Sequence, residues 1–450
     1  MTRNSGDVMR ARHKRRPLPP PLSRPRNSFL AGAAKYLCYV RIALHVAGHF
    51  ARRGLGWRRY PLFVYRALVF LVALRHNKIV KRGGLYKLHL YVPAYPTRAF
   101  FHALEKFLRP DPGPVTVVLS MTRACTYHCP HCYQKKDAGA DLPIETLTRA
   151  AGAMQAAGVS MFDIEGGEPL LRLERLIRLM DALDDRGELW INTIGARLTD
   201  ETIERLADAR LFGVMVSLHS PDPQVHDAFT GVPGAFDAAC GAIRRFGRRG
   251  IFTAVNCCPN AEAVEAGQLD RLIDLARRLG CAFVQVIHPK SAGGWLGRVK
   301  EADDSPEVIG RLREMHLRYN SGGRFGGFPS VSCQVFEEGP RMFGCTAGGV
   351  DRFYMGADGE VQPCEFLNVS FGNVRQEPFG VIFRRMRSHL HTPCTDWLCC
   401  TQADSINKVI ADRRLTRTPV PWEITRELIG TWRRGPRTRL YRKLGIYGSA

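Results

Sequence analysis

Short apolar runs that alternate with helix-like segments from residue 115 onward constrain the fold of this chain more than any other feature. The segments between the runs have helical spacing, as at Leu173, Leu176, Ile177 and Met180. Because parallel strands need crossover connections, this alternation predicts an α/β fold with a parallel sheet. Six units are too few for a closed eight-stranded barrel, so we expect a partial (β/α)6 parallel barrel. The predicted strands are residues 115–120, 161–165, 189–193, 213–218, 252–257 and 282–287.

Charge is distributed unevenly along the 450 residues. Of the net charge of +23, residues 1–114 carry +20 and residues 401–450 carry +7, whereas residues 115–400 carry −4. Basic flanks suit an anionic partner, either a membrane or nucleic acid. Residues 1–28 are basic and rich in proline, which predicts a disordered arm.

Two apolar stretches with basic flanks, residues 29–51 and 61–74, predict amphipathic helices. Such helices can lie in a membrane interface or pack on the rest of the protein, and both interpretations stay open. Residues 84–95 predict one or two strands, and residues 97–109 a short helix. The chain has no run of 18 uncharged apolar residues and no signal-like N-terminus. We therefore expect a cytoplasmic protein, with peripheral attachment to the inner face of the membrane as a second option.

Three of the 14 cysteines, Cys125, Cys129 and Cys132, follow the first predicted strand at metal-binding spacing. Three thiolates on a short loop can hold three irons of a [4Fe–4S] cluster and leave the fourth iron open. On spacing alone a zinc site also remains open, with His128 or His131 as the fourth ligand, as does a redox pair. Without an export signal, a disulfide framework is not expected.

The Cys-x3-Cys-x2-Cys loop resembles the signature of the radical S-adenosylmethionine (SAM) superfamily, and the resemblance covers residues 115–290. Gly166-Gly167-Glu168-Pro169, after the second predicted strand, is similar to the GGEP motif with which that family binds the amino group of SAM. Glycines allow a close backbone approach, and a carboxylate suits an ammonium. His131 stands at the position that is usually aromatic in the family.

Three further polar residues at predicted strand ends match weaker family segments. Asn192 lies in a segment similar to the family's TNG, Ser217 lies in one similar to its SLDG, and Asn256 ends the fifth predicted strand. The resemblance implies that these side chains contact the cofactor. The sequence departs from the family pattern at Glu165, often Thr, and at His219, often Asp.

The resemblance implies one-electron reductive cleavage of SAM to methionine and a 5′-deoxyadenosyl radical, which removes hydrogen from an unactivated C–H bond. The enzyme would be an oxidoreductase or transferase. It would need a flavodoxin-like or ferredoxin-like electron donor.

The C-terminal cysteines predict a second cluster. Cys345, Gly359 and Cys364 resemble the opening of a SPASM or twitch auxiliary-cluster domain, and the Asp-Gly turn at 358–359 predicts a hairpin that brings the two cysteines together. Cys394 and Cys400 would complete the ligand set. Cys399 is the alternative to Cys400, and Cys333 could replace one of these later ligands.

Two substrate classes follow, a ribosomally made peptide and a membrane lipid or prenyl compound. A peptide is suggested by the SPASM or twitch resemblance, and a lipid by the apolar, basic segment 29–110 with its possible anionic membrane partner. The alternative function is a non-catalytic iron–sulfur or zinc protein that binds nucleic acid through its basic arms, and the GGEP segment argues against it. We expect five regions: an arm (1–28), an N-terminal extension (29–110), a radical SAM core (111–300), an auxiliary-cluster domain (301–405) and a basic tail (406–450).

Overall fold

The computed structural model describes residues 27–52, 59–109, 113–135 and 139–447. All six predicted strands are present and parallel to their neighbours, so the predicted α/β fold is confirmed. The predicted bounds hold to within two or three residues, because a strand buried on both faces is a continuous apolar run. The six are β4 (Thr116–Ser120), β5 (Met161–Glu165), β6 (Glu188–Thr193), β7 (Leu211–Ser217), β8 (Phe252–Cys257) and β9 (Phe283–Val286).

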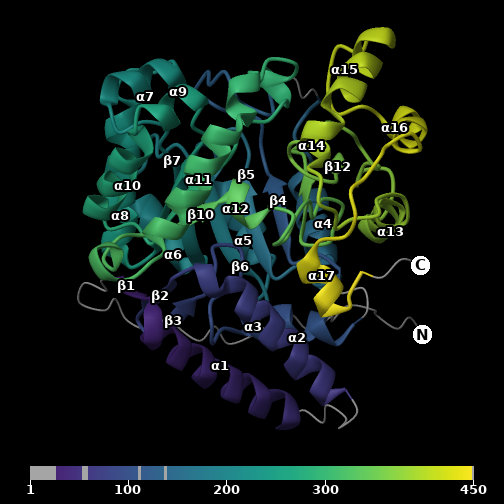
Figure 1. The fold of residues 1–450 in the computed structure, drawn as a ribbon. Helices are drawn as coiled ribbons and strands as arrows, with labels where there is room; N and C mark the ends of the chain where they lie inside the picture. The colour runs from purple at the N-terminus through teal and green to yellow at the C-terminus, as the bar shows by residue number, and fades with distance from the viewer. Residues whose placement is uncertain (1–26, 53–58, 110–112, 136–138, 448–450) are drawn as a thin grey trace, which may run out of the picture.

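Amphipathic helices connect these strands and cover the outside of the sheet (Figure 1). On α10, for example, Leu272, Ile273 and Ala276 are buried while the opposite face is charged. The helices of this layer are α4 (Ile144–Ala156), α5 (Leu173–Asp181), α6 (Asp200–Asp208), α7 (Pro223–Thr230), α8 (Ala235–Arg249), α9 (Ala261–Glu265) and α10 (Gln268–Leu279).

The C-terminal part of the chain extends the sheet at both edges. Strand β10 (Ser330–Cys333) pairs in parallel with β9, and β11 (Arg352–Met355) pairs in parallel with β4. The predicted hairpin is present, since β12 (Val361–Gln362) runs antiparallel to β11. The strand order is β10-β9-β8-β7-β6-β5-β4-β11-β12, so the sheet stays open and the partial barrel is confirmed.

A single hydrophobic core joins the barrel to the C-terminal region, and it includes Val117 on β4 and Trp432 near the C-terminus. The C-terminal helices lie on and beside the sheet, except that the last one packs against the N-terminal extension (Figure 1). They are α11 (Pro306–Tyr319), α12 (Gln334–Glu337), α13 (Phe379–His389), α14 (Leu398–Thr401), α15 (Ala403–Asp412), α16 (Trp422–Ile429) and α17 (Arg439–Leu444). Single 3₁₀ turns occur at Leu74–His76, Glu105–Leu108, Pro169–Arg172, Gly293–Trp295, Glu301–Asp304 and Gly323–Phe325.

The N-terminal extension closes the end of the barrel at which the strands begin. Val80 and Leu90 pack with Met161, Trp190 and Phe252, which lie on β5, β6 and β8. Both predicted helices are present, and most of the predicted disordered arm (1–28) falls outside the described residues. The elements are β1 (Ser28–Leu30), α1 (Gly32–Arg52), α2 (Tyr60–Ala73), β2 (Ile79–Arg82), β3 (Leu85–Lys87) and α3 (Arg98–Leu104).

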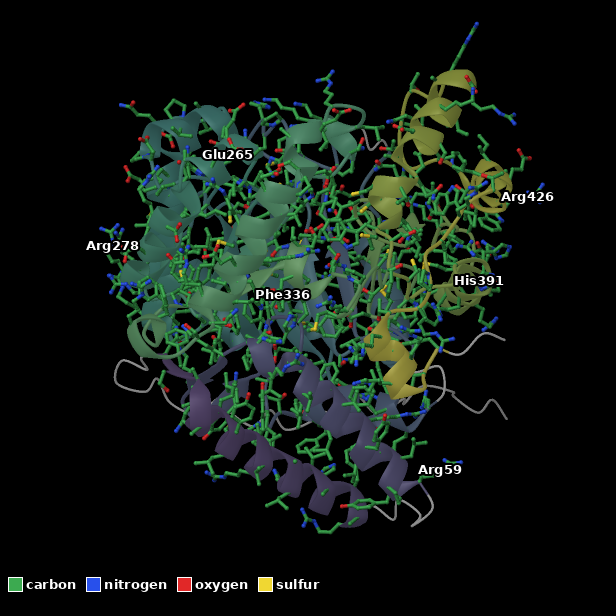
Figure 2. All side chains as sticks on the ribbon, in the orientation of Figure 1. Arg59, Glu265, Arg278, Phe336, His391 and Arg426 are labelled. Atoms are coloured by element: carbon green, nitrogen blue, oxygen red, sulfur yellow. The ribbon has the colours of Figure 1, made fainter. Side chains whose placement is uncertain are left out.

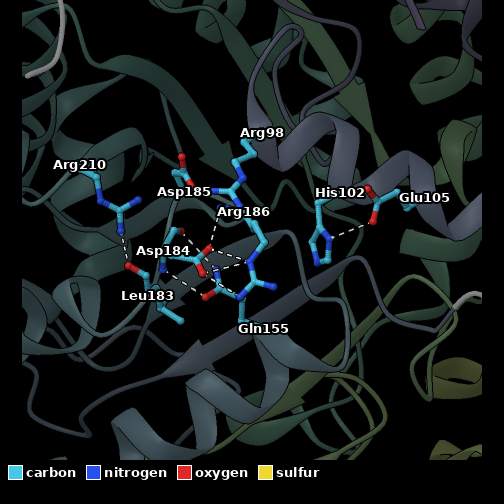
Figure 3. Close-up of polar contacts among 9 residues, drawn as sticks. All are labelled: Arg98, His102, Glu105, Gln155, Leu183, Asp184, Asp185, Arg186 and Arg210. Atoms are coloured by element: carbon cyan, nitrogen blue, oxygen red, sulfur yellow. Dashed lines mark hydrogen bonds and ion pairs between the residues drawn. The ribbon is translucent and has the colours of Figure 1, made fainter. Parts of the chain in front are cut away.

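Polar contacts fix the extension to the barrel. The Lys87 ammonium donates to the Glu188 carboxylate at 2.6 Å, and both side chains are fully buried. At the surface, Arg98 of α3 forms an ion pair with Asp185 at 2.8 Å (Figure 3). Among the described residues, every helix falls short of the length and apolar character needed to span a bilayer.

Candidate active site

A cavity of about 140 Å³ lies at the end of the barrel where the parallel strands finish. Residues at the ends of four neighbouring strands line it: Glu165, Thr193 and Ser217 are the last residues of β5, β6 and β7, and Asn256 is the next-to-last residue of β8. Ligand sites are expected at this end of a parallel sheet. Of the residues predicted to bind the cofactor, the cavity wall contains His131, Gly166, Gly167, Asn192, Ser217 and Asn256.

The cysteine loop follows β4 and forms one side of this region. Cys125 is exposed, and Cys129 and Cys132 are partly exposed. Burial, with the two other thiols nearby, raises the pKa of Cys129 to about 12. In the part of the chain that the structure describes, no three His, Cys, Asp or Glu side chains converge at metal-binding distances.

Two glycine-containing segments hold the cysteine loop. The Gly167 amide donates to the Thr122 carbonyl at 2.8 Å, and a side chain at Gly167 would overlap the Ala124 carbonyl oxygen. From the other side, the Gly294 amide donates to the Cys132 carbonyl at 2.9 Å. The GGEP glycines therefore allow backbone to pass close to the cysteine loop, and they place Gly166 and Gly167 at the cavity wall.

The Glu168 carboxylate lies behind the cavity wall and is fully buried. It accepts hydrogen bonds from the Thr193 hydroxyl at 2.8 Å and from the Ile194 amide at 2.7 Å. It also accepts from the Leu170 amide and so caps the turn that begins at Pro169. Burial raises the pKa of Glu168 to about 7, while these three donors stabilise the carboxylate. In this structure Glu168 positions the end of β6.

Glu165 belongs to a buried acidic group beneath the cavity. The Asn192 amide donates to Glu165 at 3.1 Å and to Asp163 at 3.4 Å. Burial raises the pKa of Glu165 to about 8 and that of Asp163 to about 7. Within the described residues, Glu165 Oε1 and Asn192 Oδ1 have no hydrogen-bond partner, so a ligand in the cavity would find two unused polar atoms in its wall.

A cluster of aromatic rings lies at the side of the cavity next to the cysteine loop. His131 contacts the rings of His219, Phe229 and Trp295, with centroid distances of 4.8, 4.9 and 5.6 Å. Burial lowers the pKa of His131 to about 4, so the ring is neutral at physiological pH. His131 thus packs in an aromatic environment, as the usual residue at this position in the family would.

Lys290 connects the cavity with the C-terminal cysteines. Its ammonium lies 3.2 Å from His288 Nδ1 and 3.4 Å from the centre of the Trp397 ring. Cys400 follows Trp397 closely, and a hydrogen bond from Cys399 lowers the pKa of Cys400 to about 7, with Lys290 contributing to the same effect.

The other C-terminal cysteines gather around the same place. Cys345 pairs with Cys394 through two backbone hydrogen bonds, of 2.8 and 3.2 Å. Leu398, the first residue of α14, lies near the Cys345 sulfur, so this pair is close to the start of α14, where Cys399 lies. Cys364 lies near Cys399, and its thiol donates a hydrogen bond to the Glu365 carboxylate at 3.1 Å. In contrast, Cys333 ends β10 and neighbours Cys257.

Several residues of the cavity wall were not among the predicted site residues. Tyr133 and Phe366 come from the cysteine loop and from the segment after β12, so only tertiary packing brings them together. Cys258 also lines the cavity. Its position directly after the fifth predicted strand was the available signal.

The comparisons with known proteins agree with this geometry. Residues 119–259 match the family model described as the Radical SAM superfamily. An AdoMet-dependent heme synthase from Oleidesulfovibrio alaskensis is 26% identical over 301 residues, which cover 61% of this chain and 76% of the relative. A PqqA peptide cyclase from Ruegeria pomeroyi is 28% identical over 319 residues, covering 66% and 81%. The solved structure of Streptococcus suis SuiB bound to precursor peptide SuiA aligns with a TM-score of 0.49 and 17% identity, covering 63% and 69%.

The chain therefore carries a domain of the radical SAM superfamily, and it is an enzyme of that class. This confirms the family resemblance found in the sequence. The family implies a [4Fe–4S] cluster and SAM, and the residues present fit both. Three thiols on one loop are suitable cluster ligands, and the cavity beside them offers unused polar atoms.

Proposed function

We propose that Cys125, Cys129 and Cys132 hold a [4Fe–4S] cluster and that SAM binds in the adjoining cavity. When bound, the reduced cluster and SAM supply one-electron cleavage of a C–S bond of SAM, which yields methionine and a 5′-deoxyadenosyl radical. The observation that carries the proposal is that His131 and Tyr133, on the cysteine loop itself, line the cavity at the strand ends.

The residues around the cavity have distinct roles in this proposal. Gly166 and Gly167 place backbone beside the cysteine loop, and Glu168 holds Thr193 and Ile194 in position. Glu165, protonated at neutral pH because of its raised pKa, and Asn192 offer polar atoms to the cofactor or substrate. His131, Trp295 and the neighbouring rings exclude water. Ser217 and Asn256 supply further polar contacts.

We further propose an auxiliary iron–sulfur cluster held by Cys345, Cys364, Cys394 and Cys400. Support comes from the backbone pairing of Cys345 with Cys394 and from the position of Cys400 on the nearby helix α14. Adjacent cysteines rarely both bind one cluster, so Cys399 is left as the hydrogen-bond donor to Cys400. Cys333 lies beside Cys257 and has no role in this ligand set.

For the substrate we propose a peptide, whose C–H bond would lose a hydrogen atom to the radical. The PqqA peptide cyclase among the relatives supports this class. An electron donor of the flavodoxin or ferredoxin type would reduce the cluster. A lipid or prenyl substrate is the second candidate, motivated by the apolar, basic N-terminal extension. The radical SAM domain favours an enzyme over the non-catalytic, nucleic-acid-binding alternative.

The test is to measure 5′-deoxyadenosine formed from SAM by the anaerobically reconstituted, dithionite-reduced protein. A Cys125→Ala/Cys129→Ala/Cys132→Ala variant should form none, whereas a Cys240→Ala control, which removes a buried thiol on α8, should retain the activity. Iron and sulfide analysis should give about eight irons per chain and about four in the triple variant. A fully loaded wild-type protein that leaves SAM intact would refute the proposal.

A further inference from the structure

Exposed apolar side chains are concentrated on α1 and α2. Ten large hydrophobic residues of the described chain are exposed, and eight of them lie on these two helices. Soluble proteins usually expose such residues singly, and a concentrated apolar patch marks an interaction site. The eight are Tyr36, Leu37, Val40, Leu44, Leu62, Tyr65, Leu68 and Val72, with exposed fractions between 48 and 72%.

Helix α1 is apolar on two faces. Its inner face buries Ile42, Val46 and Phe50 against the rest of the extension, so the exposed Leu37, Val40 and Leu44 are not needed for that packing. Neither α1 nor α2 contains an acidic residue. Within the described residues this outer face stays exposed, so it is available to an external partner.

A groove of about 970 Å³ adjoins this surface, between α2, α17 and the segment that follows α12. Tyr65, Leu68 and Val72 form its apolar wall. No Asp or Glu lines the groove, and within the described residues none of its five cations forms an ion pair. The five are Arg75, Arg313, Arg341, Arg439 and Lys443, and all are exposed.

This surface lies away from the active site. Helices α1 and α2 belong to the N-terminal extension, whose Val80 and Leu90 pack at the end of the barrel where the strands begin. The SAM cavity lies at the other end, where the strands finish. Figure 1 shows α1 and α2 along the lower edge, with α17 beside α2, and Figure 2 places Arg59, which precedes α2, at that edge. A molecule bound here is therefore a docking partner and does not reach the cavity.

We propose that the outer face of α1 and α2, together with the basic groove, docks on a membrane that contains anionic phospholipid. Apolar side chains enter the interface while cations around them meet head-group phosphates. A peptide in the groove would leave Leu37, Val40 and Leu44 on α1 uncovered. A second copy of the chain would bring two strongly basic surfaces together, because residues 1–114 carry +20. This inference is independent of the proposed substrate.

Point substitutions are the appropriate test, because β2 and β3 of the extension close the barrel and a truncation would disrupt the fold. Binding of the reconstituted, full-length enzyme to phosphatidylcholine vesicles, with and without phosphatidylglycerol, is measured by co-sedimentation. One variant, Leu37→Ser/Val40→Ser/Leu44→Ser, removes apolar contacts, and a second, Arg439→Glu/Lys443→Glu, reverses groove charges. The matched control Arg244→Glu/Arg248→Glu reverses two exposed arginines of α8. Circular dichroism verifies that each variant is folded.

The wild-type enzyme should bind vesicles that contain phosphatidylglycerol, and both test variants should bind at least tenfold more weakly while the control is unchanged. Equal losses in the control would assign the binding to general charge, including the basic arm, and would overturn the proposal. Retained binding by the groove variant would remove the groove from the site. A concentration-dependent dimer that the apolar variant abolishes, without vesicle binding, would assign the face to a second copy. Absence of wild-type binding would also overturn the proposal.

Discussion

The buried ion pair between Lys87 and Glu188 tests whether the N-terminal extension is an integral part of the barrel. The two side chains are 0% and 1% exposed, and Glu188 also accepts hydrogen bonds from the Ala94 amide at 2.6 Å and the Trp190 indole at 2.8 Å. Removing one member of such a pair leaves an uncompensated buried charge, which costs about 3–5 kcal/mol. We therefore expect Lys87→Met to lower the free energy of unfolding by that amount at pH 7.

The assay is urea denaturation followed by tryptophan fluorescence, because Trp190 is buried beside the pair. The double variant Lys87→Met/Glu188→Gln removes the stranded charge and keeps an acceptor, so it should regain about 2 kcal/mol. The control Arg98→Met breaks the exposed pair with Asp185 and should cost about 0–1 kcal/mol. A loss below 1 kcal/mol for Lys87→Met, or no regain in the double variant, would refute this account of the extension.

Three further predictions concern the site. Because burial raises the pKa of Glu165 from 4.5 to about 8, its contribution to stability is complete below pH 4.5 and is lost as the pH rises toward 8. The free energy of unfolding of the wild type minus that of Glu165→Gln should thus fall by about 1.4 kcal/mol per pH unit within that window. Chemical denaturation at several pH values measures this difference, and a difference that does not change with pH would contradict the prediction. Gly167→Ala should cost about 1–3 kcal/mol and weaken SAM binding in calorimetry, whereas Gly152→Ala, with open space around it on α4, should be neutral or stabilising. Cys400→Ser should remove about four irons per chain while Cys399→Ser retains them, and equal losses would reject the preferred ligand set.

Most of the barrel could be predicted from the sequence, since its buried strands and amphipathic helices leave strong periodic patterns. The edge strand β10 could not, because Ser330–Cys333 is short and partly polar and joins the sheet only through its pairing with β9. Residues that line the cavity from remote segments, such as Phe366, leave no local signal either. The hydrogen bonds of Glu168 to Thr193 and Ile194 could not be predicted either, because they depend on how the ends of β5 and β6 approach each other.

The pairing of β4 with β11 has a consequence for how the protein folds. Thr116 on β4 is matched with Arg352 on β11, so the strand that leads into the cysteine loop gains its second neighbour only after most of the chain has been made. Contacts between segments so far apart along the chain slow folding, because a large loop must close before the pairing stabilises it. We expect the cysteine loop of the nascent chain to remain loosely held until residues 352–355 emerge from the ribosome. Maturation of the metal site would then follow the emergence of β11.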